Sequence, residues 1–375
     1  MTLALNVSRL DLLAALALLQ NVAAKKGTMA ILANILLETD QDGLLLTATD
    51  LEIGIRCRVP AEILSPGAIT LPAKKLFEVI KETEENQINL SEYENFWIKI
   101  SSKNSDCRMA GIEADEFPEF PDYSEHKMVG ISSLLLRSLL DKTTYAIAQE
   151  GESTFNLTGL LLEKEIMADD HVLRAVSSNG HRLALMEKRS EEDLSDLVMD
   201  RVILIPKKGV QELRKLCDEA EKVFLGIEEK QIVFKAGSFI LVIRLMSDDF
   251  PNYKSIVHSV NETNCLEVER KKLMNSLRRV NIFADDRFSA VSFVMASNNM
   301  TISSQSMDYG SAKEEIPIVY NGDPLEVGFN GRYFYESIQL MASENIKICI
   351  NKKSPCFIKG DDDRGYLSMI MPMKL

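Results

Sequence analysis

The 375-residue sequence has no apolar run long enough to cross a membrane. A membrane-spanning helix needs about 20 consecutive apolar residues, and the longest candidate, residues 10–22, contains Asp11, Gln20 and Asn21. The N-terminus also lacks a basic stretch followed by an apolar core and a small-residue cleavage site, which is the pattern of an export signal. These absences predict a cytoplasmic protein without a membrane partner.

The sequence also lacks closely spaced cysteine pairs. Its 6 cysteines are scattered without a C-x-x-C motif, which argues against a zinc site and against a disulfide framework. We therefore expect reduced cysteines, no bound metal and no other cofactor. With only 18 Gly and 11 Pro but 46% hydrophobic residues, the chain is typical of ordinary globular domains, two or three of them by length.

One pattern occurs three times along the chain. Residues 71–81, LPAKKLFEVIK, recur at 205–215 as IPKKGVQELRK, and a weaker copy begins at Val327. Upstream of each copy, apolar residues at helical spacing predict a first helix. Each unit then consists of helix, strands, helix and strands, which predicts an α+β fold with two helices on one face of antiparallel sheets. We predict domains at 1–126, 127–260 and 261–375.

Positive charge is concentrated in the predicted helices. The chain has a net charge of −13, yet these segments together carry +11 and the remainder carries −24. The segments are 5–26, 71–81, 130–149, 204–216, 266–282 and 327–342. One interpretation is a phosphate-facing surface on an acidic body. The alternative is that lysine and arginine simply favour solvated helix faces. The recurrence of a lysine pair, Lys74-Lys75 and Lys207-Lys208, favours a shared surface.

Six segments in a characteristic order carry a family resemblance. They are Thr47-Ala48-Thr49-Asp50-Leu51-Glu52, 70–75, Asn179-Gly180-His181-Arg182-Leu183, 202–209, Asp249-Phe250-Pro251-Asn252-Tyr253 and 371–375. In this order the sequence resembles the bacterial DNA polymerase III β subunit family, the sliding clamps, along essentially its whole length.

The resemblance implies three clamp-type domains in each chain and a closed ring of two chains with helices lining the hole. It also implies a function in DNA replication: a non-catalytic processivity factor of the DNA polymerase III holoenzyme. Such a ring encircles double-stranded DNA without sequence specificity, because contacts to phosphate carry no sequence information. The implied partners are a clamp loader, the replicative polymerase, and repair proteins that bind through short linear peptides.

The resemblance further implies a partner-peptide cleft between the second and third domains. Its walls are Leu157, Ser178, Gly180, His181, Arg182, Leu183, Pro251, Ile256, Asn330, Tyr333, Pro355, Cys356, Met369, Ile370, Met371, Pro372 and Met373. Aliphatic and thioether side chains suit an adaptable apolar groove. Two departures from the family pattern, Ser255 and Ser178-Asn179, fall on its polar rim.

Two further contact sets follow from the resemblance. The dimer contact would join Cys107 and Met109 of one chain to Ile282 and Phe283 of the other. The DNA contacts would be Lys26, Arg137, Lys207, Lys208 and Arg279, with a loop contact near Phe155.

An enzyme acting on nucleotides or nucleic acid is the alternative function. It would need a catalytic constellation, and His181 has no partner at a metal or triad spacing in the sequence. Pro206-Lys207-Lys208-Gly209 lacks the glycine spacing of a P-loop. Asp361-Asp362-Asp363 could hold Mg²⁺, but we predict a solvated hairpin tip instead.

Overall fold

The computed structural model describes residues 2–24, 29–151, 155–168, 170–258, 262, 264–284, 289–351 and 354–374. The chain forms two compact units. The first comprises Met1–Leu136, Glu192–Val198 and Lys208–Leu245, and the second comprises Arg137–Glu191, Met199–Lys207 and Met246–Leu375. Among the helices of the described ranges, none combines the length and apolarity that a membrane span requires.

The first unit contains two antiparallel sheets. Its strands are β1 (Ala4–Ser8), β2 (Asn34–Asp40), β3 (Gly43–Thr49), β4 (Ile53–Val59), β5 (Ala61–Ser65), β6 (Ala68–Pro72), β7 (Gln87–Tyr93), β8 (Trp97–Ser102), β9 (Ser105–Ala110), β10 (Val129–Ser132), β15 (Lys222–Ile227), β16 (Gln231–Ala236) and β17 (Phe239–Arg244). Five strands form one sheet in the order β5-β1-β7-β8-β9. Eight form the other in the order β10-β15-β16-β17-β4-β3-β2-β6.

The second unit also contains two antiparallel sheets. Its strands are β11 (Gly159–Met167), β12 (Asp170–Ser178), β13 (Arg182–Arg189), β14 (Ile203–Pro206), β18 (Cys265–Glu269), β19 (Ala290–Ala296), β20 (Asn299–Ser306), β21 (Gly310–Pro317), β22 (Leu325–Asn330), β23 (Asn345–Cys349), β24 (Cys356–Gly360) and β25 (Tyr366–Ile370). The orders are β14-β11-β12-β13-β25-β24-β23-β18 and β21-β20-β19-β22.

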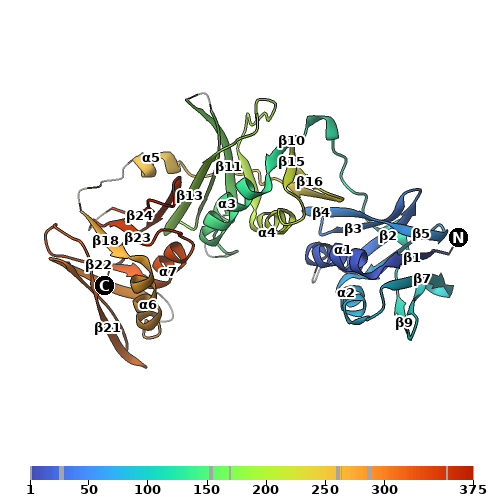
Figure 1. Ribbon diagram of the computed structural model, residues 1–375, viewed down its shortest axis with the longest axis horizontal. Coiled ribbons are helices and arrows are strands. Elements are labelled where there is room, and N and C mark those ends of the chain that lie inside the picture. Colours follow the sequence, from blue (N-terminus) through green and yellow to red (C-terminus); the bar gives the residue numbers. More distant parts are fainter. Residues whose placement is uncertain are drawn as a thin grey trace. The chain divides into compact units, whose positions relative to one another are not determined.

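The α-helices are α1 (Arg9–Val22), α2 (Ala73–Glu82), α3 (Ser133–Thr143), α4 (Lys207–Leu216), α5 (Tyr253–His258), α6 (Arg270–Asn281) and α7 (Gly331–Gln339). Short 3₁₀ helices are η1 (Ala30–Ala33), η2 (Glu94–Phe96), η3 (Ala114–Glu116), η4 (Glu125–Lys127), η5 (Thr144–Ala146) and η6 (Phe155–Leu157). Two helix pairs lie side by side: α1 with α2 in the first unit and α6 with α7 in the second (Figure 1).

Each of the six long helices in the described chain begins directly where a strand ends. The pairs are β1 with α1, β6 with α2, β10 with α3, β14 with α4, β18 with α6 and β22 with α7. Side-chain caps mark two of these starts, because Ser8 accepts a hydrogen bond from the Asp11 amide and Asn330 from the Tyr333 amide. The recurrence of one strand-to-helix step confirms the repeat predicted from the sequence.

The predicted helical segments were wrong at their starts. Segment 5–26 begins with strand β1, where burial alternates and Leu5 and Val7 point into the core. Burial repeats about every 2 residues in a strand and about every 3.6 residues in a helix. A stretch of about four residues before the helix is too short to distinguish the two periods. The apolar stripes were correct, because Leu12, Leu16 and Leu19 are fully buried.

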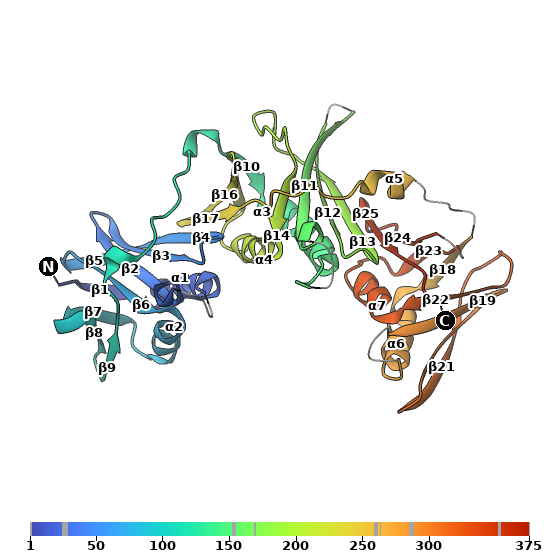
Figure 2. The ribbon, with the colours of Figure 1, turned by 180° about the vertical axis from the view of Figure 1, so that it is seen from behind.

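The two eight-stranded sheets pair strands across the domain boundaries predicted near residues 126 and 260. In the first unit β4 pairs with β17, with Ile55 opposite Leu241. In the second unit β25 lies between β13 and β24 (Figure 2), with Leu183 opposite Met369. Strand pairing across the boundaries explains why compactness divides the chain into two units although the repeat divides it into three.

Candidate functional site

The C-terminal tail is docked on the second unit by strand pairing and by two further backbone bonds. Strand β25 pairs with β13, and the Met371 amide then donates to the His181 carbonyl at 2.8 Å. The Met373 amide donates to the Gly328 carbonyl, also at 2.8 Å. These bonds hold the tail against the β12–β13 turn on one side and β22 on the other. The structure thus brings the predicted tail and hairpin segments together.

The β12–β13 turn is fixed by its own side chains. Asn179 Oδ1 accepts hydrogen bonds from the His181 and Arg182 amides, each at 3.1 Å. Ser178 Oγ accepts one from the Gly180 amide at 3.1 Å. Gly180 has φ +85°, a conformation that other residues adopt at a steric cost. The Ser178-Asn179 departure therefore supplies the hydrogen bonds that shape this turn.

Arg182 is a buried anchor behind the turn. Its guanidinium lies over the rings of Tyr333, 4.3 Å from the centroid, and Tyr145, 5.0 Å away. It also donates to the Glu336 carboxylate and the Tyr145 carbonyl. Stacking and charge pairing together fix the Tyr333 ring, and Asn179 Nδ2 donates to its hydroxyl at 3.2 Å. Arg182 therefore acts by positioning Tyr333.

A buried apolar group, here called the Leu183 cluster, lies on one face of the eight-stranded sheet of the second unit. Its members are Leu161, Val176, Leu183, Leu185, Leu204, Tyr253, Cys349, Phe357, Leu367 and Met369. Met246, Phe250, Val257 and Cys265 pack against it while remaining partly exposed. The cluster forms a continuous apolar floor that runs from the hairpin to α5.

The predicted cleft residues occupy three kinds of place. Met371 and Ile256 expose 43% and 41% of their surface, and Pro251 is also exposed. Leu157, Leu183, Cys356, Met369 and Ile370 are buried. Burial raises the pKa of the Cys356 thiol well above its ordinary value. Gly180, His181, Ser178, Asn330, Tyr333, Pro355, Pro372 and Met373 lie at turns, segment ends or partly exposed positions.

Tyr253 is a member of the candidate site that the sequence reasoning did not name as a cleft residue, although it ends the Asp249–Tyr253 segment used for the resemblance. Its ring belongs to the Leu183 cluster, and its hydroxyl donates to the Glu163 carboxylate. Burial and that carboxylate raise the pKa of Tyr253. Arg174 donates to the Tyr253 hydroxyl at 3.3 Å and pairs with Glu187 at 2.7 Å. A groove of about 1130 Å³ continues beside them between α5 and β23–β25.

Four of the predicted DNA-contacting cations lie in the described part of the chain, and each has a partner within the chain. Arg137 pairs with Asp141 at 3.6 Å, and Lys207 donates to the Ile147 carbonyl at 3.3 Å. Lys208 pairs with the Asp50 carboxylate, and Arg279 pairs with Glu314 through two bonds of 2.7 Å. Lys26 lies outside the described residues, and so does the Phe155 side chain. Phosphate would have to compete with these internal partners.

The predicted dimer-contact residues lie at sheet and helix ends. Cys107 and Met109 are on β9, an edge strand of the five-stranded sheet. Cys107 also lines a small recess together with Ile88 and Ile100. Ile282 follows α6 and exposes 71% of its surface. An edge strand and an exposed isoleucine are both features that another chain can cover.

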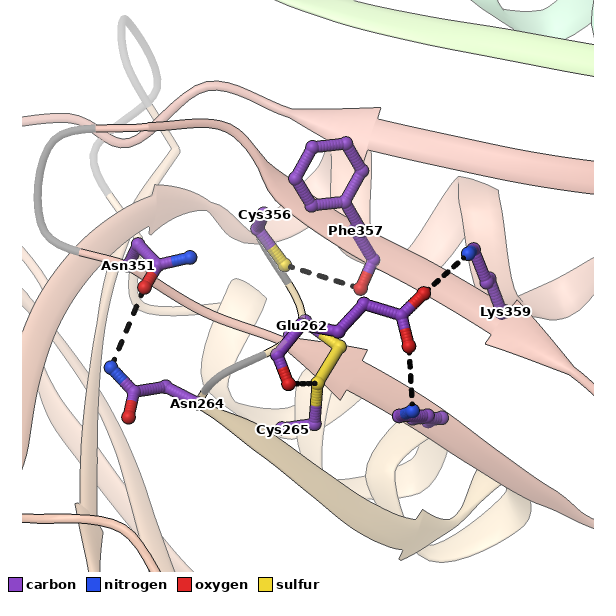
Figure 3. The surroundings of a disulfide bond; sticks show 9 residues. Glu262, Asn264, Cys265, Asn351, Cys356, Phe357 and Lys359 are labelled. Carbon is purple, nitrogen blue, oxygen red and sulfur yellow. Dashed lines mark hydrogen bonds and ion pairs between the residues drawn. A yellow bond between two sulfur atoms is a disulfide. The ribbon is translucent and has the colours of Figure 1, made fainter. Parts of the chain in front are cut away.

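The prediction of reduced cysteines was wrong for one pair. Cys265 and Cys349 form a disulfide between the first residue of β18 and the last residue of β23 (Figure 3). They are 84 residues apart in sequence, and only the antiparallel register places them opposite each other. Cys57, Cys107, Cys217 and Cys356 carry thiols.

The prediction of a solvated tip at Asp361-Asp362-Asp363 was wrong for its last residue. Asp363 is 5% exposed and accepts hydrogen bonds from the Ala342 and Ser343 amides. Asp361 and Asp362 are exposed, as predicted. No group of three metal-ligating side chains occurs within the ranges that the structure describes.

Three family models together match almost the whole chain. They are the N-terminal, central and C-terminal domains of the DNA polymerase III beta subunit, at residues 3–121, 130–252 and 259–374. The beta sliding clamp of Chlamydia pneumoniae is 27% identical over 369 residues, covering 98% of both chains. That of Vibrio cholerae is 26% identical over 373 residues, covering 99% of both.

Solved structures agree in fold over the full length. A crystal structure of the C. crescentus beta sliding clamp matches with a TM-score of 0.92 at 27% identity, covering 100% of this chain and 99% of that one. A Bartonella birtlesii sliding clamp bound to griselimycin matches with a TM-score of 0.92 at 26% identity, covering 100% of both. The chain therefore belongs to the DNA polymerase III beta subunit family, the beta sliding clamps, which are non-catalytic processivity factors of that polymerase.

Proposed function

We propose that two copies of this chain close a ring around duplex DNA and hold the replicative polymerase and repair proteins through short peptides. The observation that carries the proposal is the docked tail, in which the Met371 amide bonds to the His181 carbonyl of the β12–β13 turn and Met369 belongs to the Leu183 cluster. An exposed apolar tail rich in methionine is unfavourable in water, and exposed apolar surface of this kind is typical of binding sites. The proposal includes domains at 1–126, 127–260 and 261–375.

The proposed peptide surface combines an apolar floor with a rigid polar rim. The Leu183 cluster offers a site for leucine and aromatic anchors, and the partly exposed Met371 side chain can adapt to different anchors. The β12–β13 turn and Tyr333 are already fixed by hydrogen bonds. Preorganised walls reduce the ordering cost of binding a flexible peptide.

The proposed ring contact joins unlike patches. Edge strand β9 with Cys107 and Met109 belongs to the first unit, and exposed Ile282 with Phe283 belongs to the second. When each of two copies contributes one patch of each kind, the contact forms twice and the two copies make a closed ring. Because a closed ring cannot thread onto circular DNA by itself, we include a clamp loader among the partners.

The proposed DNA contacts are to phosphate alone. Arg137, Lys207, Lys208 and Arg279 sit on α3, α4 and α6, and their internal carboxylate and carbonyl partners would keep each contact weak. Weak contacts to phosphate are screened by salt and do not read sequence. Such a ring would slide along the duplex.

Retention on DNA of different topology tests the proposal. The protein is loaded by a clamp loader onto nicked circular DNA, and half of the sample is then cut once with a restriction enzyme. We expect the protein to co-elute with the circle in gel filtration and to be lost from the linear form. Equal retention on circular DNA and on linear DNA with free ends would contradict encirclement.

A further inference from the structure

We propose that Cys265 and Cys349 form a thiol–disulfide switch that controls how firmly α5 is held beside the Leu183 cluster, and thereby the affinity for partner peptides. The inference rests on the proposed peptide-binding function of that surface and concerns its regulation. It is carried by the position of the disulfide, by the neighbours of its two sulfurs, and by the attachments that remain when it is reduced.

The disulfide closes the open end of an edge-strand pair. Cys265 and Cys349 are directly opposite in the antiparallel pairing of β18 with β23, and β18 is the edge of the eight-stranded sheet. The Ile350 amide donates to the Asn264 carbonyl at 2.9 Å just beyond them. The first residue of β18 is therefore joined covalently to the last residue of β23.

The disulfide shares its neighbours with the proposed peptide surface. Cys349 is 3% exposed and is a member of the Leu183 cluster. Cys265 packs against that cluster, as does Val257 of α5, while Tyr253 of α5 is inside it. A displacement of the strand end at Cys265 is therefore transmitted through packed side chains to α5.

A second, weaker attachment lies beside the disulfide (Figure 3). The Glu262 carboxylate accepts hydrogen bonds from Lys359 and Lys347, both at 2.9 Å. These two bonds lower the pKa of Glu262 to about 2. All three side chains are more than 40% exposed, and exposed ion pairs contribute only about 0–1 kcal/mol. After reduction, the strand end at Cys265 would thus be held by the β18–β23 pairing, the Ile350–Asn264 bond and these exposed ion pairs, without the covalent bond.

The exposure of the two cysteine residues indicates the order of the exchange. Cys265 is partly exposed and Cys349 is buried, so the thiolate of a small thiol such as glutathione attacks Cys265 Sγ. The S–S bond breaks, its electron pair leaves on Cys349 Sγ, and this sulfur takes a proton. A second small thiolate then releases Cys265 as a thiol and departs in the oxidised small disulfide. Two thiols supply the two electrons, and oxidised glutathione drives the reverse reaction.

The direction of the effect follows from preorganisation. In the oxidised form α5 and the Leu183 cluster are held in the binding arrangement, so less order must be imposed when a peptide binds. In the reduced form α5 has to be ordered when the peptide binds, and the free energy of this ordering weakens the affinity. We expect the dissociation constant of a partner peptide to rise about three- to tenfold on reduction. In a reducing compartment a disulfide of this kind is a redox-sensing one.

The test compares the peptide affinity of the oxidised and the reduced full chain. Both are measured at the same temperature, at which the protein is folded. The protein is incubated with oxidised glutathione or with excess dithiothreitol, and thiols are counted by alkylation and mass spectrometry. Affinity is measured by fluorescence polarisation with a labelled peptide that carries glutamine followed by leucine and phenylalanine anchors. Cys265→Ser removes the switch, and Cys57→Ser is the matched control because Cys57 is a free thiol in the other unit and lies outside the proposed contacts.

We expect tighter binding by the oxidised wild type and by oxidised Cys57→Ser, and no redox response in Cys265→Ser. Equal affinity in both states, with the disulfide verified in one of them, would overturn the switch and leave the peptide surface standing. Failure of oxidised glutathione to form the bond would also overturn it. Absence of peptide binding in both states would overturn the proposed surface and the switch together.

Discussion

Lys142, in the last turn of α3, donates a hydrogen bond to the Asp363 carboxylate at 2.6 Å, although 221 residues separate the two in sequence. The same carboxylate accepts from the Ser343 hydroxyl at 2.7 Å and from the Ala342 amide at 2.9 Å. Burial alone would raise the pKa of Asp363, but the bonds from Lys142, Ala342 and Ser343 outweigh it and lower that pKa. A charged, fully bonded carboxylate therefore ties α3 to the chain that follows α7.

Removal of this carboxylate is expected to destabilise the second unit strongly. Asp363→Ala leaves the Lys142 ammonium, whose side chain is only 17% exposed, without its counter-ion, and breaking a buried pair in this way costs about 3–5 kcal/mol. Asp362→Ala is the matched control, because its side chain is exposed and only its amide is bonded. Urea unfolding should show a change within about 0.5 kcal/mol for the control. Equal effects of the two substitutions would contradict this role.

The stabilisation from Asp363 is expected to depend on pH in one direction. Its folded pKa lies below the ordinary value, so the contribution is complete above the unfolded pKa of about 3.9 and is lost as the pH falls through the folded value. The difference in unfolding free energy between wild type and Asp363→Ala should be constant between about pH 5 and 7 and shrink below about pH 4. Urea titrations across this range measure it. A difference that grows on acidification would be inconsistent with a lowered pKa.

Truncation of Ile282 and Phe283 to alanine is expected to give a folded monomer. Ile282 is 71% exposed in the single chain, so its removal costs little in the fold, whereas each truncation at an interface centre costs about 2–4 kcal/mol. Val319→Ala, also at an exposed position, is the control and should remain dimeric. Sedimentation velocity at micromolar concentration distinguishes the two states. A dimeric double variant would show that the contact lies elsewhere.

Deletion of residues 371–375 is expected to abolish peptide binding while leaving the dimer intact. The deletion removes the Met371 and Met373 amides that bond to the His181 and Gly328 carbonyls, but it leaves β25 in place. Met371→Ala should weaken binding, and Met167→Ala, at a similarly exposed methionine, should not. Fluorescence polarisation and sedimentation are run on the same samples. Unchanged peptide affinity in the truncated dimer would remove the tail from the site.

Local patterns in the sequence predicted the repeated helices and the family well. The spacing of Leu12, Leu16 and Leu19 predicts a helix whose apolar stripe is buried, and it is. The same patterns placed helix starts too early, because a short strand such as β1 and a helical turn differ by only one or two apolar positions.

Features that depend on long-range register could not be predicted. Nothing near Cys265 in the sequence indicates Cys349, because the pairing follows from the alignment of β18 with β23. Asp363 lies in a run of three acidic residues, a pattern that is typical of a solvated turn. Its partner Lys142 belongs to a helix that is far away in sequence. In the proposed cleft, the hairpin and tail were found from the resemblance. Tyr145 and Glu336, which hold Arg182, carry no local signal.

The position of β25 has a consequence for how the protein is made. Strand β13 has its partner β12 within a few residues, but its other neighbour, Tyr366–Ile370, is synthesised much later than either. Until then the nascent chain presents an unpaired strand edge rich in leucine, which is a template for pairing with the wrong chain. A message truncated before codon 366 would therefore yield a product that is prone to aggregate, because this sheet cannot be completed until β25 has been made.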